Sequence, residues 1–132
     1  DVSKCFENLS TDMLPTALRG EELLRSTRNS NSSFESVFSD LISYVNYGRN
    51  HGIVIGPEFS RIYAEILLQK IDSKIEILLA NNNIRYGRDY VIKRYVDDYF
   101  LFYNDDNILS PIKKCALDNL SNYKLFINES KD

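Results

Sequence analysis

A long run of apolar residues at helical spacing constrains the fold of this chain more than any other feature. Residues three, four and seven positions apart lie on one face of an α-helix, so the spacing predicts a single apolar stripe along about six turns. Pro57 suits the first turn of such a helix, and Asn81-Asn82-Asn83 breaks the pattern, so we expect a helix near residues 57–80. The stripe consists of Phe59, Ile62, Tyr63, Ile66, Leu67, Ile71, Ile75 and Leu78. We expect it to lie in the core.

A second segment, from Val91 to Tyr103, is β-branched and aromatic except where Val96-Asp97-Asp98 interrupts it. This pattern predicts a β-hairpin that turns at the acids. Tight hairpin turns favour Asn-Gly or Asp-Gly because they need positive φ, so turn chemistry does not explain the two aspartates. Adjacent carboxylates repel each other, and a hard dication such as Mg²⁺ compensates them. On spacing alone, a metal site and a solvated acidic turn are equally good interpretations.

The remaining patterns indicate an α+β fold, an antiparallel sheet with helices packed on one face. The chain has 132 residues and 43% hydrophobic content, enough for one core, so we expect one domain over residues 1–132 with a polar loop near residues 25–33. The other expected elements are the end of a strand from Asp1 to Phe6, a short helix reaching Leu18, a helix from Phe34 to Val45, a turn or short strand between Gly52 and Gly56, a helix from about Ile108 to Leu120 and a strand around Leu125 to Ile127.

Composition narrows the class of protein. The net charge of −3 gives no general support for nucleic-acid binding. Cys5 and Cys115 lack Cys or His partners at zinc-like spacing, so we expect reduced thiols in the core. No apolar run approaches the ~20 residues that span a bilayer, so we expect a cytoplasmic protein without a membrane partner. The chain opens on Asp-Val-Ser rather than Met, and we expect it to be part of a longer polypeptide.

Four blocks follow one another along the chain: Asp1-Val2-Ser3-Lys4-Cys5-Phe6, Gly52-Ile53-Val54-Ile55-Gly56-Pro57-Glu58-Phe59-Ser60, Arg94-Tyr95-Val96-Asp97-Asp98-Tyr99-Phe100 and Leu125-Phe126-Ile127-Asn128-Glu129-Ser130-Lys131. In this order they resemble four motifs of the reverse transcriptases. The first resembles a strand-end motif led by a metal-binding Asp, and the second resembles a Gly-rich loop. The third resembles the Tyr-x-Asp-Asp box with its flanking aromatic residues, and the last resembles the Leu-x-Leu-Asn-x-x-Lys block.

Within that family the chain is most similar to the bacterial abortive-infection, or phage-defence, reverse transcriptases. It departs from retroviral and intron-encoded enzymes at Val54 and Ile55, where those enzymes carry Pro and Gln. Loss of the Gln puts ordinary template handling in doubt. The resemblance therefore implies an RNA-directed DNA polymerase-type nucleotidyltransferase acting in antiviral defence, with templated synthesis left open.

The resemblance also implies a polymerase palm belonging to a longer enzyme, with a two-metal site. Asp1 and Asp97 would bridge two Mg²⁺ ions, with Mn²⁺ as a substitute; Asp98 would complete the cluster and the Val2 carbonyl would add a neutral ligand. The deoxynucleoside triphosphate would meet three further residues. These are Phe6, under the sugar, with Gly56 in the Gly-rich loop and Lys131 beside the triphosphate. An ordinary core role for Phe6 and a solvated position for Lys131 stay open.

Basic residues are concentrated before and within the hairpin. Arg85, Arg88, Lys93 and Arg94 alternate with tyrosines, as a groove that follows a nucleic-acid backbone requires, although a solvated surface is an equal alternative. Arg61 is the remaining candidate for a phosphate contact, and its alternative is an ion pair with Glu58 or Glu65. The implied partner is a nucleic-acid primer, with or without a template, or a protein-linked primer; the oligomeric state stays open.

Two rival functions remain. A catalytically silent polymerase-like scaffold would bind nucleic acid or protein, but retention of all three acids argues against it. A phosphohydrolase or nuclease would use the same acids but has no need of the Gly-rich loop or the Phe6 gate. Product analysis separates extension, binding alone and shortening.

Overall fold

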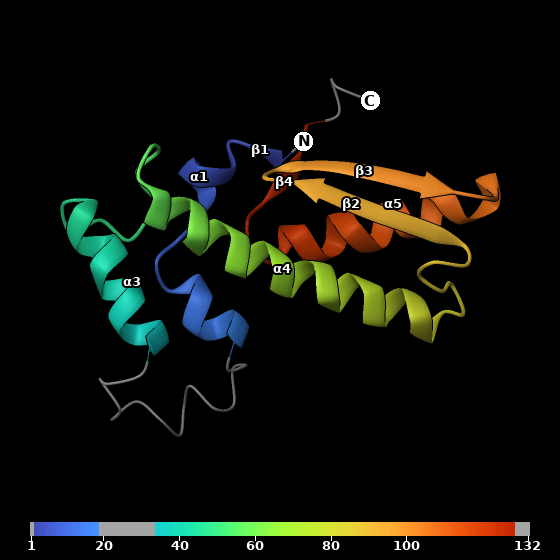
Figure 1. The fold of residues 1–132 in the computed structure, drawn as a ribbon, viewed down its shortest axis with the longest axis horizontal. Coiled ribbons are helices and arrows are strands. Elements are labelled where there is room, and N and C mark those ends of the chain that lie inside the picture. Colours follow the sequence, from blue (N-terminus) through green and yellow to red (C-terminus); the bar gives the residue numbers. More distant parts are fainter. Residues whose placement is uncertain (1, 19–33, 129–132) are drawn as a thin grey trace. The chain divides into compact units, whose positions relative to one another are not determined.

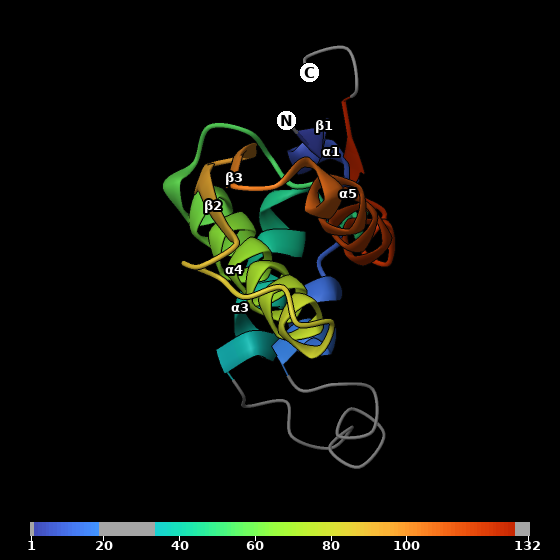
Figure 2. The ribbon, with the colours of Figure 1, turned by 90° about the vertical axis from the view of Figure 1, so that its right-hand side faces the viewer.

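A computed structural model of the protein describes residues 2–18 and 34–128. Backbone contacts divide the chain into two compact units (Figures 1 and 2). One, here called the helical unit, is Phe6–Lys70, and the other, here called the hairpin unit, combines Asp1–Cys5 with Ile71–Asp132. Each unit is described by itself.

The helical unit is organised around one buried tyrosine. The Tyr63 hydroxyl donates to Ser10 O at 2.8 Å and accepts from Leu14 N at 3.2 Å, and burial raises the Tyr63 pKa to about 12. The Phe38 ring meets the Tyr63 ring edge-on at 5.7 Å. These contacts join three segments that are distant in sequence. The helical elements of the unit are α1 (Cys5–Asn8), a helix over residues 13–18, α3 (Phe34–Val45) and the first part of α4 (Glu58–Asn81).

The hairpin unit contains two separate two-stranded antiparallel sheets. In the first, β1 (Val2–Ser3) pairs with β4 (Phe126–Ile127), with Val2 opposite Ile127. In the second, β2 (Tyr90–Tyr95) pairs with β3 (Asp98–Tyr103), from Tyr90 opposite Tyr103 to Tyr95 opposite Asp98.

The helices of this unit are α5 (Asp106–Ser121) and the last part of α4. Figure 1 shows the β2–β3 hairpin running alongside both helices. Asp105 caps α5 by accepting a hydrogen bond from Asn107 N, a favourable partner for an otherwise unsatisfied N-terminal amide. The buried apolar residues of the unit include Val2, Ile71, Ile75, Leu79, Ile112, Leu120 and Leu125.

The expected positions of the long helices and the hairpin are confirmed: α3, α4 and α5 lie where the periodicity placed them, and the hairpin turns at Val96 and Asp97. The expected core stripe of α4 is only partly correct, because Ile62 and Leu78 are exposed. The expected single sheet is wrong, because β1 and β4 pair with each other and not with the hairpin. The first strand ends at Ser3 rather than near Phe6, since Lys4 has a φ of 48° and turns the chain into α1. Residues 53–57 form no strand. The α+β class stands.

The described part of the chain contains no helix with both the length and the apolar character needed to cross a membrane.

Candidate metal-binding turn

The acidic turn between β2 and β3 has an unusual backbone. Tyr95 pairs with Asp98, so only Val96 and Asp97 form the turn, and Val96 has a φ of 57°. Positive φ disfavours a β-branched residue, at a cost of about 1–3 kcal/mol, and persists only where surrounding contacts enforce it. The sequence offers no glycine here, so contacts from elsewhere must hold the turn.

Arg94 supplies one of those contacts. Its guanidinium Nη1 donates to Val96 O at 2.7 Å, and its Nε donates to Asp72 Oδ2 on α4 at 2.8 Å. The Tyr99 hydroxyl donates to the other Asp72 oxygen at 2.7 Å, and the Arg94 guanidinium lies 5.9 Å from the centre of the Tyr99 ring. Burial, followed by the Asp72 charge, raises the Tyr99 pKa, so this hydroxyl stays protonated and donates.

β1 supplies a second contact to the turn. Val2 N donates to Asp97 O at 2.9 Å, while Val2 pairs with Ile127 in β4. Parts of three of the four blocks that resemble reverse-transcriptase motifs therefore meet at one place. Asp1 lies outside the described residues.

The two described acids are partly exposed. In the part of the chain that the structure describes, neither the Asp97 nor the Asp98 carboxylate takes part in a hydrogen bond or ion pair, whereas both carboxylate oxygens of Asp72 accept one. Residues 2–18 and 34–128 contain no group of three or more His, Cys, Asp or Glu residues that could hold a metal ion, and the third expected acid, Asp1, is not among them. The turn thus presents two adjacent carboxyl groups that no side chain or backbone donor of the described residues engages.

Cys5 lies in the electrostatic field of the turn. Burial, followed by the negative charge of Asp97, raises its thiol pKa to about 11, against an opposing effect of Arg94. The thiol is therefore protonated and inert at neutral pH, as expected for a core cysteine. Cys115 is also free and is half-buried.

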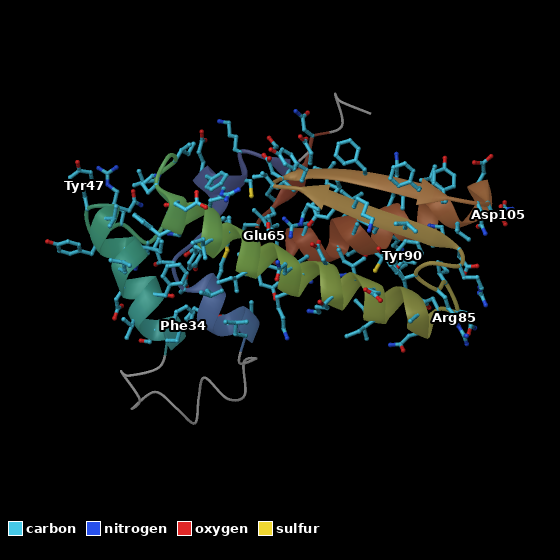
Figure 3. All side chains as sticks on the ribbon, in the orientation of Figure 1. Phe34, Tyr47, Glu65, Arg85, Tyr90 and Asp105 are labelled. Atoms are coloured by element: carbon cyan, nitrogen blue, oxygen red, sulfur yellow. The ribbon has the colours of Figure 1, made fainter. Side chains whose placement is uncertain are left out.

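A cavity of about 180 Å³ lies behind the hairpin. Arg94, Tyr99 and Asp72 line it, together with Glu76, Tyr86 and Tyr90. Tyr90, labelled in Figure 3, is buried, and its hydroxyl has no hydrogen-bond partner among the described residues. Burial together with the Glu76 charge raises its pKa to about 12. Ile75, Ile92 and Ala116 complete the lining, so polar and apolar side chains both face this cavity.

The Gly-rich loop and Phe6 meet within the helical unit. Ile53 N donates to Phe6 O and Gly52 N to Leu9 O, both at 2.8 Å. A Cβ on Gly52 would stand 3.2 Å from Glu7 O, and Gly52 has a φ of 75°, so this close approach requires glycine. Gly56, with a φ of 118°, lies in open, exposed loop, and Phe6 is half-buried. Lys131 lies outside the described residues.

The expected nucleic-acid-binding residues differ in exposure and pairing. Arg94 is turned inward, with a side chain only 7% exposed, and it contacts Asp72 and Val96. Lys93 and Arg85 are exposed, and Lys93 lies opposite the exposed Phe100 on the outer face of the hairpin. Arg61 pairs with Glu58 at 2.6 Å, the alternative considered for it.

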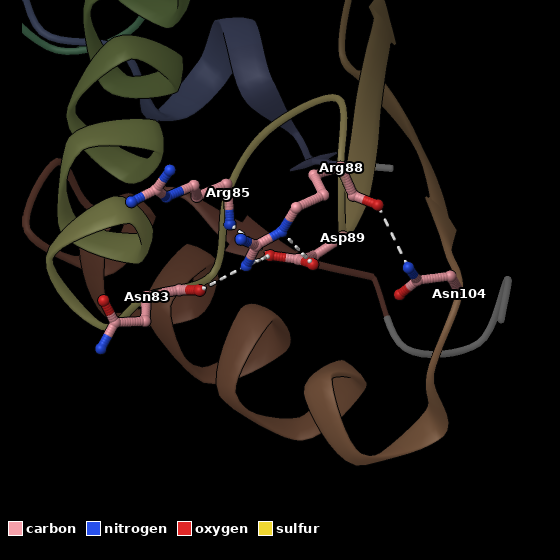
Figure 4. A network of polar contacts seen from close by, with 5 residues as sticks. All are labelled: Asn83, Arg85, Arg88, Asp89 and Asn104. Carbon is pink, nitrogen blue, oxygen red and sulfur yellow. Dashed lines mark hydrogen bonds and ion pairs between the residues drawn. The ribbon is translucent and has the colours of Figure 1, made fainter.

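Arg88 belongs to a network at the open end of the hairpin (Figure 4). Its guanidinium donates to Asp89 at 2.7 and 2.8 Å and to Asn83 O at 3.2 Å, and its carbonyl accepts from Asn104 Nδ2 at 3.1 Å. These hydrogen bonds from Arg88, followed by one from Arg85 N, lower the Asp89 pKa to about 2. Arg88 therefore closes a loop, and its charge is already paired.

Sequence reasoning missed Asp72. The residue precedes the buried Ile75 and Leu79 by three and seven positions, so it occupies the core-facing stripe of α4. An acid at such a position is costly unless it is paired, and this was the available signal. The identity of its partner, 22 residues further along the chain, was not readable.

The chain matches no protein-family model, and a search of curated proteins finds no match either.

Proposed function

We propose that this chain is the palm portion of a metal-dependent nucleotidyltransferase of the reverse-transcriptase type, which adds deoxynucleotides to a primer in bacterial phage defence. The observation that carries the proposal is the 2.9 Å hydrogen bond from Val2 N to Asp97 O. It brings the block led by Asp1 to the Asp97-Asp98 turn, although 94 intervening residues separate Val2 from Asp97.

The chemistry needs acids at this place. A primer hydroxyl attacks the α-phosphate of a nucleoside triphosphate and gives its O–H proton to a solvent water, while pyrophosphate leaves from the opposite side. Two Mg²⁺ ions, when bound, activate the hydroxyl and neutralise the charge on the leaving group. Asp1, Asp97 and Asp98 would hold them, and the Val2 carbonyl remains a proposed neutral ligand. Mn²⁺ takes similar oxygen ligands and is the substitute ion.

Phe6, Gly56 and Lys131 are the residues proposed to contact the nucleotide. Phe6 would limit space beside the sugar, which disfavours a 2′-hydroxyl, and Gly56 would leave room for the nucleotide or template. Lys131 would lie beside the triphosphate. Lys93 and Arg85 would contact primer phosphates, with Arg88 and Arg61 contributing only if their ion pairs open.

The decisive experiment compares Asp97→Asn with Asp40→Asn in the full-length protein, supplied with Mg²⁺, deoxynucleoside triphosphates and oligonucleotide primers. Asp97→Asn removes one ligand charge while keeping side-chain size, so nucleotide addition should fall below detection. Asp40 is an exposed acid of α3, and its substitution should leave the rate unchanged. Incorporation by Asp97→Asn at the wild-type rate would contradict the proposed site.

Thermal unfolding gives a second measurement that does not depend on knowing the primer. Because repulsion between neighbouring acids is relieved, Asp97→Asn should be no less stable than the wild type without Mg²⁺. A ligand that binds only the folded state stabilises it, so added Mg²⁺ should raise the Tm of the wild type more than that of the variant. Equal shifts would favour a solvated acidic turn.

Product analysis of the wild type addresses the rivals. Extension of a primer supports the proposed activity, and shortening of the primer would indicate a nuclease. Binding without any change in length would indicate a silent scaffold.

A further inference from the structure

We propose that Asp72 is a positioning residue for the acidic turn: it orients Arg94, and Arg94 fixes the Val96 carbonyl and hence the Asp97 and Asp98 carboxylates. The positioning itself follows from the contacts among Asp72, Arg94 and Val96. Its consequence for metal binding rests on the proposed function.

The turn needs external support at both of its residues. Val96 has a φ of 57° and no glycine is present to relieve the conformation. The two turn carbonyls are held by donors from different elements: Val96 O by Arg94 Nη1 at 2.7 Å and Asp97 O by Val2 N at 2.9 Å. Loss of either bond would leave an unfavourable backbone conformation with one restraint fewer.

Arg94 depends on Asp72 for its orientation. A guanidinium is planar, so fixing its Nε against Asp72 at 2.8 Å also fixes the direction in which Nη1 points. Asp72 is itself held, because its other oxygen accepts from the Tyr99 hydroxyl at 2.7 Å. The position of the turn is thereby fixed relative to α4, which carries Asp72, and not by the hairpin alone.

Asp72 also has an electrostatic role. Arg94 is a cation with its side chain 7% exposed, and Asp72 neutralises it. Without Asp72, Arg94 would lose the hydrogen bond that directs its Nε and the negative charge paired with it. Both losses weaken the restraint that Arg94 places on the Val96 carbonyl.

The chain offers a matched control at the other end of the same hairpin. Arg88 and Asp89 form an Arg–Asp pair of similar length, 2.7 Å, but the Arg88 side chain is 61% exposed and the pair makes no contact with Val96 or Asp97. A substitution in this pair removes the same chemistry without touching the turn.

The test uses the full-length protein with Asp72→Ala, Asp72→Asn, Tyr99→Phe and the control Asp89→Asn. Two quantities are measured: the Mg²⁺ concentration that gives half-maximal nucleotide addition, and the exchange rate of the Val2 amide proton, which reports the Asp97 carbonyl. Loss of a residue that orients metal ligands typically weakens metal affinity 10–100-fold, so Asp72→Ala should raise the Mg²⁺ midpoint by about tenfold or more.

The conservative variants separate positioning from general structural damage. Asp72→Asn keeps an oxygen that accepts from Arg94 Nε but loses the charge, so its Mg²⁺ midpoint should lie between those of the wild type and Asp72→Ala. Saturating Mg²⁺ should recover most of the rate in each variant. Tyr99→Phe leaves the Asp72–Arg94 bond and should have a smaller effect, of about twofold. Asp89→Asn should leave both measurements unchanged.

Several outcomes would decide the inference. A folded Asp72→Ala protein with wild-type Mg²⁺ midpoint and wild-type Val2 exchange would overturn it. If Asp72→Ala does not fold, an Asp72→Asn midpoint and Val2 exchange equal to those of the wild type would overturn it, and an intermediate rise in both would support it. If the wild type adds no nucleotide, the proposed function fails, and faster Val2 exchange in the Asp72 variants still supports positioning.

Discussion

The two ends of the β2–β3 hairpin carry similar ion pairs in different environments. At the turn, Arg94 and Asp72 join β2 to α4 across 22 positions of sequence, and the arginine is almost fully buried. At the open end, Arg88 pairs with its sequence neighbour Asp89, and the arginine is exposed. The first pair connects two elements, whereas the second orders a single loop.

This difference shows that the residue types of an ion pair do not determine how much the pair contributes to the free energy of unfolding. A long-range buried pair restricts the position of two elements, and removal of one partner leaves a charge that water hydrates only in part. A local exposed pair competes with water and contributes little to the free energy of unfolding. Only the first pair also reaches the turn that carries the acids.

The largest expected effect is on stability. Arg94→Ala should lower the free energy of unfolding by about 3 kcal/mol, the lower part of the range for breaking a buried pair, because Asp72 retains partial exposure. Arg88→Ala should lower it by at most about 1 kcal/mol. Urea unfolding of both variants measures the contrast, and equal losses would remove the distinction between the two ends.

A second prediction concerns the backbone of the turn. Glycine tolerates positive φ, so Val96→Gly should be less destabilising than Val91→Gly, a change at a half-buried position of β2, by about 1 kcal/mol or more. Thermal or urea unfolding of the pair gives the comparison. A larger loss for Val96→Gly would mean that side-chain packing of Val96 outweighs its strain.

The Tyr99 hydroxyl provides a smaller test. Tyr99→Phe removes one hydrogen bond to a charged acceptor and should cost about 1 kcal/mol, while keeping the ring under Arg94. Tyr103, on the same strand and 40% exposed, serves as the control, and Tyr103→Phe should be neutral. If both changes cost the same, the Tyr99–Asp72 bond has no measurable role.

The smallest effect is expected at the open end and appears only in acid. The Asp89 pKa is lowered from 3.8 to about 2, so its contribution to stability is present above about pH 4 and is lost as the pH falls toward 2. Asp89→Asn should remove that part of the pH dependence of unfolding. An unchanged profile between pH 4 and 2 in the variant would contradict the assignment of this contribution to Asp89.

Much of the local structure was readable from the sequence. The apolar stripe of α4, the periodicity of α3 and α5, and the β-branched and aromatic run broken by Val96-Asp97-Asp98 each predicted an element close to its observed bounds. These are properties of a segment and its own spacing. The sheet was predicted less well, because strand pairing depends on partners at distant positions: the two residues of β1 pair with β4, and nothing in either short segment specifies this.

The features of the candidate site likewise fall into those that the sequence predicted and those that it did not. The residue types of the turn, two adjacent acids without a glycine, were visible from the sequence and marked it as chemically unusual. The inward direction of Arg94, its pairing with Asp72, the positive φ of Val96 and the bond from Val2 to Asp97 were decided only by the tertiary structure. The physical reason is that spacing determines which face of a helix or strand a side chain occupies, whereas the partner that neutralises a buried charge is determined by which elements pack together.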